Sequence, residues 1–310
     1  MPDTRKLMLL DSASLYFRAF FGVPDSFKAP DGTQVNAVRG FLDMIATLVT
    51  MRRPQRLVAC WDEDWRPEFR VAAVPSYKTH RLASGSTVAE IVPAALEIQV
   101  PIIVDLLAAL GIARVGCPGY EADDVIGALA ERAAAAGDGP VEVVTGDRDL
   151  FQLVDDARQV TVLYVGRGVR NLEVVDEKWL ERRYGVGSGR AYADLATLRG
   201  DPSDGLPGVA GVGEKSAAGL LTKFPDLVAV RAAAAAGDPR IAPGLAKKIM
   251  AAEDYLEAAA VVVQVARAAP VVELDDALPA EPADVPRLAE LADQWGVRSS
   301  VNRVLAALQA

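Results

Sequence analysis

The stretch VEVVTGDRD, residues 141–149, decides the fold class of this chain of 310 residues. Its first five residues are typical of a buried strand, and a glycine and two aspartates, Asp147 and Asp149, follow at once. The same arrangement occurs where Asp11 follows KLMLL and where Asp62 follows RLVACW. Strands that alternate with helical stretches predict an α/β fold with a parallel sheet. Acids at the ends of such strands would meet at one sheet edge, where ligands bind.

Further acids occur in two other motifs. GYEADD, residues 119–124, opens a predicted helix, and LRGDPSD, residues 198–204, precedes a glycine-rich turn. The acids of these motifs are Glu121, Asp123, Asp124, Asp201 and Asp204. So many carboxylates without matching bases would repel one another, and hard divalent cations with oxygen ligands would relieve that repulsion. The acids therefore predict a two-metal site for phosphoryl transfer.

Composition excludes several other classes of protein. About half of the residues are apolar (51%), which is enough for a full core, but no run approaches the roughly 18 apolar residues of a membrane span. The start MPDTRKLMLLDSAS lacks the pattern of a signal peptide, so a cytoplasmic protein is expected. Cys60 and Cys117 are expected to be reduced thiols. With His80 as the lone histidine, His-rich zinc sites and Ser-His-Asp triads are excluded.

The net charge of −9 is unusual for a protein that binds nucleic acid, but the bases are unevenly placed. Residues 52–81 combine seven Lys and Arg residues with Trp61, Trp65, Phe69 and Tyr77, a mixture that suits phosphates and unstacked bases. An ordinary solvated surface over aromatic core residues is an alternative. From Arg66 to about Ile91 prolines and small polar residues interrupt the helical pattern, which indicates a mobile excursion over the site.

The segment GVGEKSA, residues 211–217, forms a glycine-rich turn between two predicted short helices. Such a turn exposes backbone N–H groups at a helix N-terminus, here beside Lys215. It can hold a DNA phosphate without reading the base sequence. Beyond about Lys223 the chain is Ala-rich and gives no catalytic signal.

The order of these motifs resembles the bacterial 5′-3′ exonucleases of the flap endonuclease family, the kind fused to the front of DNA polymerase I. The matching motifs are LLDSASLYFRAFF, CWDEDWRPEFR with PSYKTHR, GYEADDVIGALA, VTGDRDLFQLV and LRGDPSDGLPGVAGVGEKSA. The resemblance implies a PIN-like (resolvase-like) α/β core over residues 1–175, with a helical arch at about 66–100. It also implies a helical region over residues 176–310, with a helix-three-turn-helix element for DNA at about 190–225.

The resemblance also assigns roles to residues. Asp11, Asp62, Glu121, Asp123 and Asp124 would form or support a first metal site, and Asp147, Asp149, Asp201 and Asp204 a second. The metal would be Mg²⁺ or Mn²⁺, and a K⁺ ion is a further candidate at the helix-three-turn-helix. Lys78 and Arg81 would contact the scissile phosphate, while Arg70 and Arg18 would steer phosphates and Tyr16 would stack on a base. Gly208, Gly211, Gly213, Lys215 and Ser216 would hold the duplex backbone. Two departures are Gly205, where the family often has Asn, and an arch that is less basic than usual.

The implied activity is structure-specific 5′-3′ exonuclease and flap endonuclease cleavage of DNA in Okazaki-fragment processing and repair. Flaps, nicks, free 5′ ends and RNA primer ends would be substrates of a nucleoid-associated monomer. Three alternatives remain at this point. They are another PIN-type nuclease such as a ribonuclease, a structure-specific DNA-binding protein with weak or no cleavage, and a magnesium-dependent phosphatase. The phosphatase would leave most of the acids unexplained, and the glycine-rich turn argues against the ribonuclease.

Overall fold

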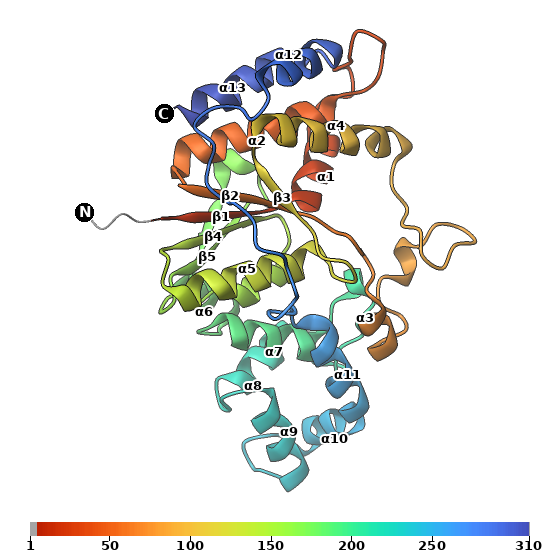
Figure 1. The fold of residues 1–310 in the computed structure, drawn as a ribbon. Coiled ribbons are helices and arrows are strands. Elements are labelled where there is room, and N and C mark those ends of the chain that lie inside the picture. The colour runs from red at the N-terminus through yellow and green to blue at the C-terminus, as the bar shows by residue number, and fades with distance from the viewer. Residues whose placement is uncertain (1–4, 310) are drawn as a thin grey trace.

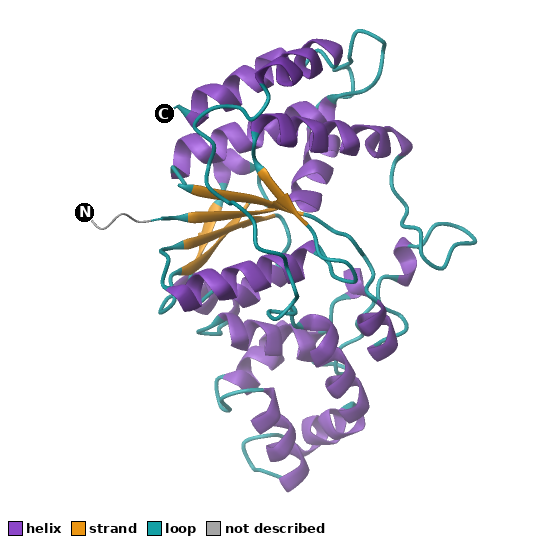
Figure 2. Cartoon of the chain, in the orientation of Figure 1, coloured by secondary structure: helices purple, strands orange, loops and turns teal. Residues whose placement is uncertain are grey.

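The computed structural model describes residues 5–309 as an α/β core with a group of helices beneath it (Figure 1). Six strands form one sheet in the order β3-β2-β1-β4-β5-β6. Figure 2 shows the strands in orange, with helices above and below them. Neighbouring strands are parallel except β5 and β6, which are antiparallel. The bounds are β1 Leu7–Asp11, β2 Arg56–Cys60, β3 Ala113–Val115, β4 Val141–Thr145, β5 Val160–Tyr164 and β6 Glu173–Val175. The predicted α/β class with a parallel sheet is confirmed.

The register of the central strands brings their carboxyl ends to one edge. Asp11 pairs with Cys60 across β1 and β2, and Leu10 pairs with Val144 across β1 and β4. All five residues of β1 and of β4 are buried, as expected for parallel strands covered on both faces. The chain therefore leaves β1, β2 and β4 side by side, directly into α1 after β1 and into loops after β2 and β4.

Alternate residues of β1 enter two different cores. Leu7 and Leu9 belong to one cluster, Met8 and Leu10 to the other, because successive side chains of a strand point to opposite faces. The Met8 side is covered by α1 Ser12–Gly22, α2 Asn36–Arg52, α4 Ala94–Leu110, α12 Val285–Gln294 and α13 Arg298–Leu308. The Leu7 side is covered by α5 Ala122–Ala136, α6 Glu177–Tyr184 and α7 Gly189–Arg199.

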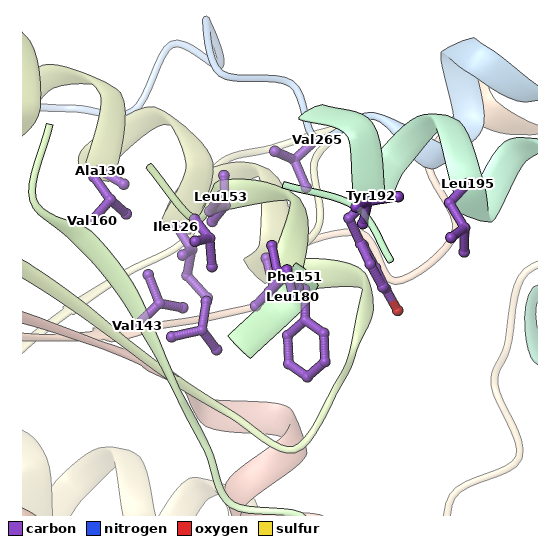
Figure 3. Close-up of a cluster of buried hydrophobic side chains, with 14 of the residues drawn as sticks. Ile126, Ala130, Val143, Phe151, Leu153, Val160, Leu180, Tyr192, Leu195 and Val265 are labelled. Atoms are coloured by element: carbon purple, nitrogen blue, oxygen red, sulfur yellow. The ribbon is translucent and has the colours of Figure 1, made fainter. Parts of the chain in front are cut away.

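Phe151 packs the loop that carries Asp147 and Asp149 against α6 and α7. It lies in the short 3₁₀ helix η2 Asp149–Leu153 and is fully buried. Its ring meets those of Tyr164, Trp179 and Tyr192 at centroid distances of 5.1, 5.4 and 5.4 Å. Figure 3 shows Phe151 and Tyr192 within this apolar cluster. Aromatic packing of this kind fixes the position of the acid-bearing loop.

The segment expected as a helical arch, about 66–100, contains little helix before α4. It holds α3 Glu68–Ala73, the 3₁₀ turn η1 Thr79–Arg81 and a loop closed by a bridge between Leu82 and Glu90. Pro67, Pro75 and Pro93 explain this, since proline cannot donate a helical hydrogen bond. Figure 1 shows the loop projecting beside the core, between α3 and α4.

The helices after α7 divide into two groups. The first group, which lies beneath the core, contains η4 Pro202–Asp204, α8 Glu214–Leu221, α9 Leu227–Ala236, α10 Pro243–Ala251 and α11 Glu253–Val263. The second group, α12 and α13, returns to the core and packs on α4 and α2. The sequence predicted one helical region over 176–310, whereas α12 and α13 share the core of α2 and α4 because their apolar faces complete it. Between residues 5 and 309, no helix combines the length and apolarity needed to cross a membrane.

Candidate active site

A small cavity of about 210 Å³ opens at the edge where the central strands end. Five of the nine acids singled out in the sequence line it, from four separate parts of the chain: Asp11 of β1, Asp62 after β2, Asp147 after β4, and Glu121 and Asp123 at the start of α5. The strand register therefore brings together acids that are up to 136 residues apart. We call this space the acid cavity.

Burial and mutual repulsion make three acids of this cavity, Asp11, Asp62 and Asp123, hard to ionise. Burial raises the pKa of Asp11 to about 7, with Asp62 and Asp147 adding to the shift against the Thr145 and Ser14 hydrogen bonds. Burial likewise raises the pKa of Asp62 to about 6 and that of Asp123 well above its usual range. A group of carboxylates so arranged favours a bound cation.

The donor set fits Mg²⁺ or Mn²⁺, because all the ligands on offer are carboxylate oxygens. Across residues 5–309, no three His, Cys, Asp or Glu side chains already lie close enough together to enclose a metal ion. The acids surround the cavity without converging on one point, as expected when like charges repel. Small side-chain movements would be needed for direct coordination.

Hydrogen bonds orient the two acids that follow β1 and β2. Asp11 caps α1 by accepting from the Ser14 backbone N–H at 3.1 Å, and it accepts from the Thr145 hydroxyl at 2.6 Å. Asp62 accepts from the backbone N–H of Ala122 at 2.8 Å, which links β2 to the first turn of α5. These bonds leave both side chains limited freedom to turn away from the cavity.

Lys78 lies between Glu121 of the acid cavity and Asp204. Its ammonium donates to Glu121 Oε2 at 2.6 Å, and its backbone N–H donates to the carbonyl of Asp204 at 3.1 Å. Burial opposes the charge of Lys78, but the Glu121 and Asp204 carboxylates together outweigh burial and raise the pKa of Lys78. Its φ of 49° is left-handed, a conformation uncommon for lysine. Tyr77 also donates to Glu121, at 2.7 Å.

Three of the other four acids, Asp149, Asp201 and Asp204, lie beside the acid cavity and do not line it. Asp149 is linked to it through its backbone N–H, which donates to Asp147 Oδ1 at 3.0 Å. Burial and the charges of Asp147, Asp204 and Asp201 raise the pKa of Asp149 well above its usual range. Burial raises the pKa of Asp204 to about 6, although Lys78 and Arg81 lower it. These three therefore form a second negative group, joined to the first at Asp147.

Arg81 bridges the two groups from the rim. Its guanidinium lines the acid cavity and lies 3.2 Å from Asp204 Oδ1. About a third of the side chain is exposed (36%), so a substrate could reach it. Arg81 and Lys78 are the two cations that line the acid cavity.

Arg70 and Asp124 have positions that differ from those expected. Arg70 is 3% exposed and makes a two-pronged pair with Asp124, at 2.7 Å for both contacts, and it also donates to the Val262 carbonyl. Asp124 is fully buried, lies outside the lining of the acid cavity and accepts from the Ala266 N–H as well. A guanidinium so enclosed cannot steer a phosphate, and both Asp124 oxygens are already engaged. The pair supports the site from below by holding α3 against α5.

The other expected DNA contacts are dispersed. Arg18 donates to the Val165 carbonyl at 2.9 Å and to that of Gly166, so it ties α1 to the end of β5 and is not free for DNA. Tyr16 lines the acid cavity, with its ring 5.6 Å from that of Trp61. Lys215 and Ser216 are exposed in the first turn of α8.

The glycine-rich turn before α8 depends on left-handed backbone. Gly208 and Gly211 have φ of 69° and 73°, and Gly213 caps α8. A Cβ on Gly208 would lie 2.2 Å from the carbonyl oxygen of Arg199, which explains why glycine is needed there. The turn is thus held closely against the end of α7.

Two residues at the site were missed in the sequence. Glu90, from the loop after η1, lines the acid cavity, and burial raises its pKa. Nothing in its surroundings of small polar residues indicated a role. Thr145 ends β4 and bonds Asp11, and its position immediately before Gly146 and Asp147 was a signal that could have been used.

Comparison with known proteins gives a consistent assignment. A family model described as "5′-3′ exonuclease, N-terminal resolvase-like domain" matches residues 6–185, and "5′-3′ exonuclease, C-terminal SAM fold" matches residues 188–285. A 5′-3′ exonuclease of Streptomyces coelicolor is 56% identical over 98% of this chain and 100% of its own. One of Mycobacterium tuberculosis is 51% identical over 97% of each.

Solved structures have the same fold at low identity. The T5 5′-exonuclease with bound zinc ions has a TM-score of 0.64 at 17% identity, over 98% of this chain and 100% of its own. The catalytic core of Rad2 in complex with DNA substrate has a TM-score of 0.61 at 17% identity, over 99% and 93%. Together with the family models and the high-identity relatives, this shows that the chain belongs to the 5′-3′ exonuclease family of metal-dependent nucleases.

Proposed function

We propose that this nuclease hydrolyses DNA phosphodiester bonds near 5′ ends, using two divalent cations held by the acid cavity and by the adjacent group of Asp149, Asp201 and Asp204. The observation that supports this most is that six carboxylates from five chain segments line one cavity, with Lys78 and Arg81 as its cations. The first group of ligands would be Asp11, Asp62, Glu121 and Asp123. Asp147 would lie between the two groups.

Mg²⁺ or Mn²⁺ in these positions would supply an activated water and would neutralise charge on the leaving oxygen. Lys78 and Arg81 would hold the scissile phosphate and stabilise the charge that develops on it. Before substrate binds, the ion pair with Glu121 keeps Lys78 charged. Arg70 and Asp124 would act only by positioning Glu121, since Arg70 Nη1 also lies 3.4 Å from Glu121 Oε1.

The proposed substrates are DNA ends selected by structure. The turn formed by Gly208, Gly211 and Gly213, with Lys215 and Ser216, would contact the duplex backbone without reading sequence. A K⁺ ion could be bound in the same turn. The loop between α3 and α4 would admit single strands at flaps, nicks and gapped ends, and RNA primer ends would also be cut. Such an enzyme would work as a cytoplasmic, nucleoid-associated monomer in Okazaki-fragment processing and repair.

The test is cleavage of a 3′-labelled duplex with a 5′ flap in Mg²⁺, in Mn²⁺ and in EDTA, beside a single-stranded RNA control. We expect metal-dependent cutting at the flap junction and little cutting of the RNA. Tight flap binding without cutting in either metal would instead favour a structure-specific DNA-binding protein.

A further inference from the structure

A second cavity lies on the other side of the loop that carries Asp147 and Asp149. It has a volume of about 600 Å³ and lies between η2, the β5–β6 hairpin and α6. Its most prominent feature is four arginines: Arg148, Arg167, Arg182 and Arg183. We call it the arginine cavity. None of the roles assigned above makes use of it.

The charge of this cavity is opposite to that of the whole chain. Four arginines line it against a single carboxylate, Glu173, although the chain carries a net charge of −9. Glu173 accepts a hydrogen bond from Trp179 Nε1 at 3.3 Å. Within residues 5–309, Arg148, Arg167 and Arg182 have no carboxylate within ion-pair distance. All three are exposed and available to an anion.

Aromatic rings form the rest of the lining. Trp179 and Tyr164 are half-buried, so part of each ring faces the cavity, whereas Phe151 is part of the core beneath. Trp179 packs on Phe151 with centroids 5.4 Å apart, which holds the indole in place. Guanidinium groups beside fixed aromatic surfaces suit a phosphate with an attached base.

The position of the cavity relates it to both proposed DNA contacts. Arg148 lies in the chain between Asp147, which lines the acid cavity, and Asp149. On the opposite rim, Arg183 Nη1 lies 3.4 Å from Glu214 Oε1 in the first turn of α8, next to Lys215. A strand that runs between the acids and α8 can therefore cross the arginine cavity.

We propose that the arginine cavity binds a nucleotide of a DNA strand, with the phosphate on Arg148, Arg167 and Arg182 and the base against Trp179. This inference rests on the proposed function for the identity of the strand. The chemistry recognised is that of a nucleotide phosphate, which a free mononucleotide released by cleavage also offers. The two sources differ in how many phosphates they present.

The test uses two double variants with equal loss of charge. Arg167→Ala/Arg182→Ala removes two cations from the cavity. Arg170→Ala/Lys178→Ala removes two exposed cations from the same hairpin and the same helix, and neither residue lines the cavity. Both variants should keep the unfolding temperature of the unchanged protein, because all four side chains are exposed.

Binding of a fluorescent single-stranded DNA 12-mer is measured by anisotropy in EDTA over a series of salt concentrations. The cavity variant should bind at least about fivefold more weakly, with a salt dependence shallower by about 1.4 for two lost contacts, and the control variant should bind almost normally. If both variants bound the 12-mer equally weakly, the loss would be explained by the lower total charge of the protein, and the proposal would be overturned.

Titration with deoxynucleoside monophosphate distinguishes the two sources. Weak, millimolar competition with the 12-mer is expected. Tight nucleotide binding that is lost in the cavity variant, with unchanged binding of the 12-mer, would make this a nucleotide site and overturn the strand proposal. The flap cleavage assay is independent of these binding measurements. A lack of cutting in Mg²⁺ would count against the proposed function. The difference in 12-mer binding between the cavity variant and the control variant would still decide the role of the arginine cavity.

Discussion

The acid cavity and the arginine cavity lie on the two sides of one short loop, and they differ in almost every property. The first has about 210 Å³, six carboxylates and two cations in its lining, and the second about 600 Å³, four arginines and one carboxylate. Two successive residues of this loop contribute to different cavities: Asp147 lines the acid cavity and Arg148 lines the arginine cavity.

This difference shows that net charge is a poor guide to the ligand of a protein. The acidic balance of the chain comes partly from residues that would hold cations, while four arginines line the cavity on the other side of the same loop. If the two cavities have the proposed roles, metal binding and phosphate binding should be separable by mutation, even though the two cavities are adjacent.

The largest expected effect comes from Asp147→Asn. If the acid cavity and its neighbouring acids hold the metals, this change should lower the single-turnover rate of flap cleavage at least about a thousandfold. Binding of the single-stranded 12-mer should be nearly unchanged, because the arginine cavity is intact. Normal cleavage in Mg²⁺ would show that Asp147 is not needed for metal binding.

The buried pair beneath the acid cavity should have the next largest effect, on stability. Arg70→Met leaves Asp124 buried without its counter-charge, so the free energy of unfolding should fall by about 3–5 kcal/mol in urea. Arg303→Met, which breaks the exposed pair with Asp43, should cost less than about 1 kcal/mol. A similar small loss in both variants would mean that the pair does not support the site.

Lys78→Ala should lower the turnover number about a hundredfold with little change in the strength of duplex binding. The reason is that Lys78 lies in the acid cavity, where charge develops on the phosphate, and away from the duplex contacts. Steady-state kinetics on flap DNA would measure both quantities, with Lys178→Ala as the control. An equal loss in turnover and binding would reassign Lys78 to simple phosphate binding.

The smallest expected effect is the dependence of metal-free stability on pH. The folded-state pKa values are about 7 for Asp11 and about 6 for Asp62 and Asp204, above the usual value near 3.8. These carboxyl groups bind their protons more tightly in the folded state than in the unfolded state. Their protonation therefore adds stability that is fully present below about pH 4 and is lost as the pH rises through 6 and 7. Without metal, the unfolding temperature should therefore fall between pH 5 and pH 8.

Mg²⁺ should offset this loss, so the shift that it produces should be larger at pH 8 than at pH 5. Differential scanning fluorimetry in EDTA and in MgCl₂ would measure both. The Asp147→Asn variant should show a smaller shift with Mg²⁺. A shift with Mg²⁺ that does not change with pH would indicate that the acid cavity is not where the cation binds.

The sequence was sufficient to predict the sheet and the gathering of acids at its edge. Asp11, Asp62 and Asp147 each follow a short buried strand, and parallel strands bring such positions together whatever the chain between them does. Local pattern therefore carries this part of the site. The glycine-rich turn before α8 was predictable for a similar reason, because left-handed backbone favours glycine.

Side-chain partners that lie far along the chain were not predictable. Arg70 and Arg18 were candidates for phosphate contacts, yet their guanidinium groups bind the carbonyls of Val262 and Val165, which no local pattern indicates. The arginine cavity was missed because its four arginines come from three separate segments. The return of α12 and α13 to the core was also missed, because their partners α4 and α2 lie far away along the chain.

That return makes the core around α2 depend on residues that are synthesised much later than α2 itself. α13 packs on α2, and about 250 residues of chain separate them. The Leu57 N–H also donates to the Asp276 carbonyl. At a synthesis rate of about 5–20 residues per second, roughly 12–50 seconds pass between the synthesis of α2 and that of α13, which covers it. The core behind the acid cavity can therefore be completed only after α13 has been synthesised, long after α2 and α4 have left the ribosome.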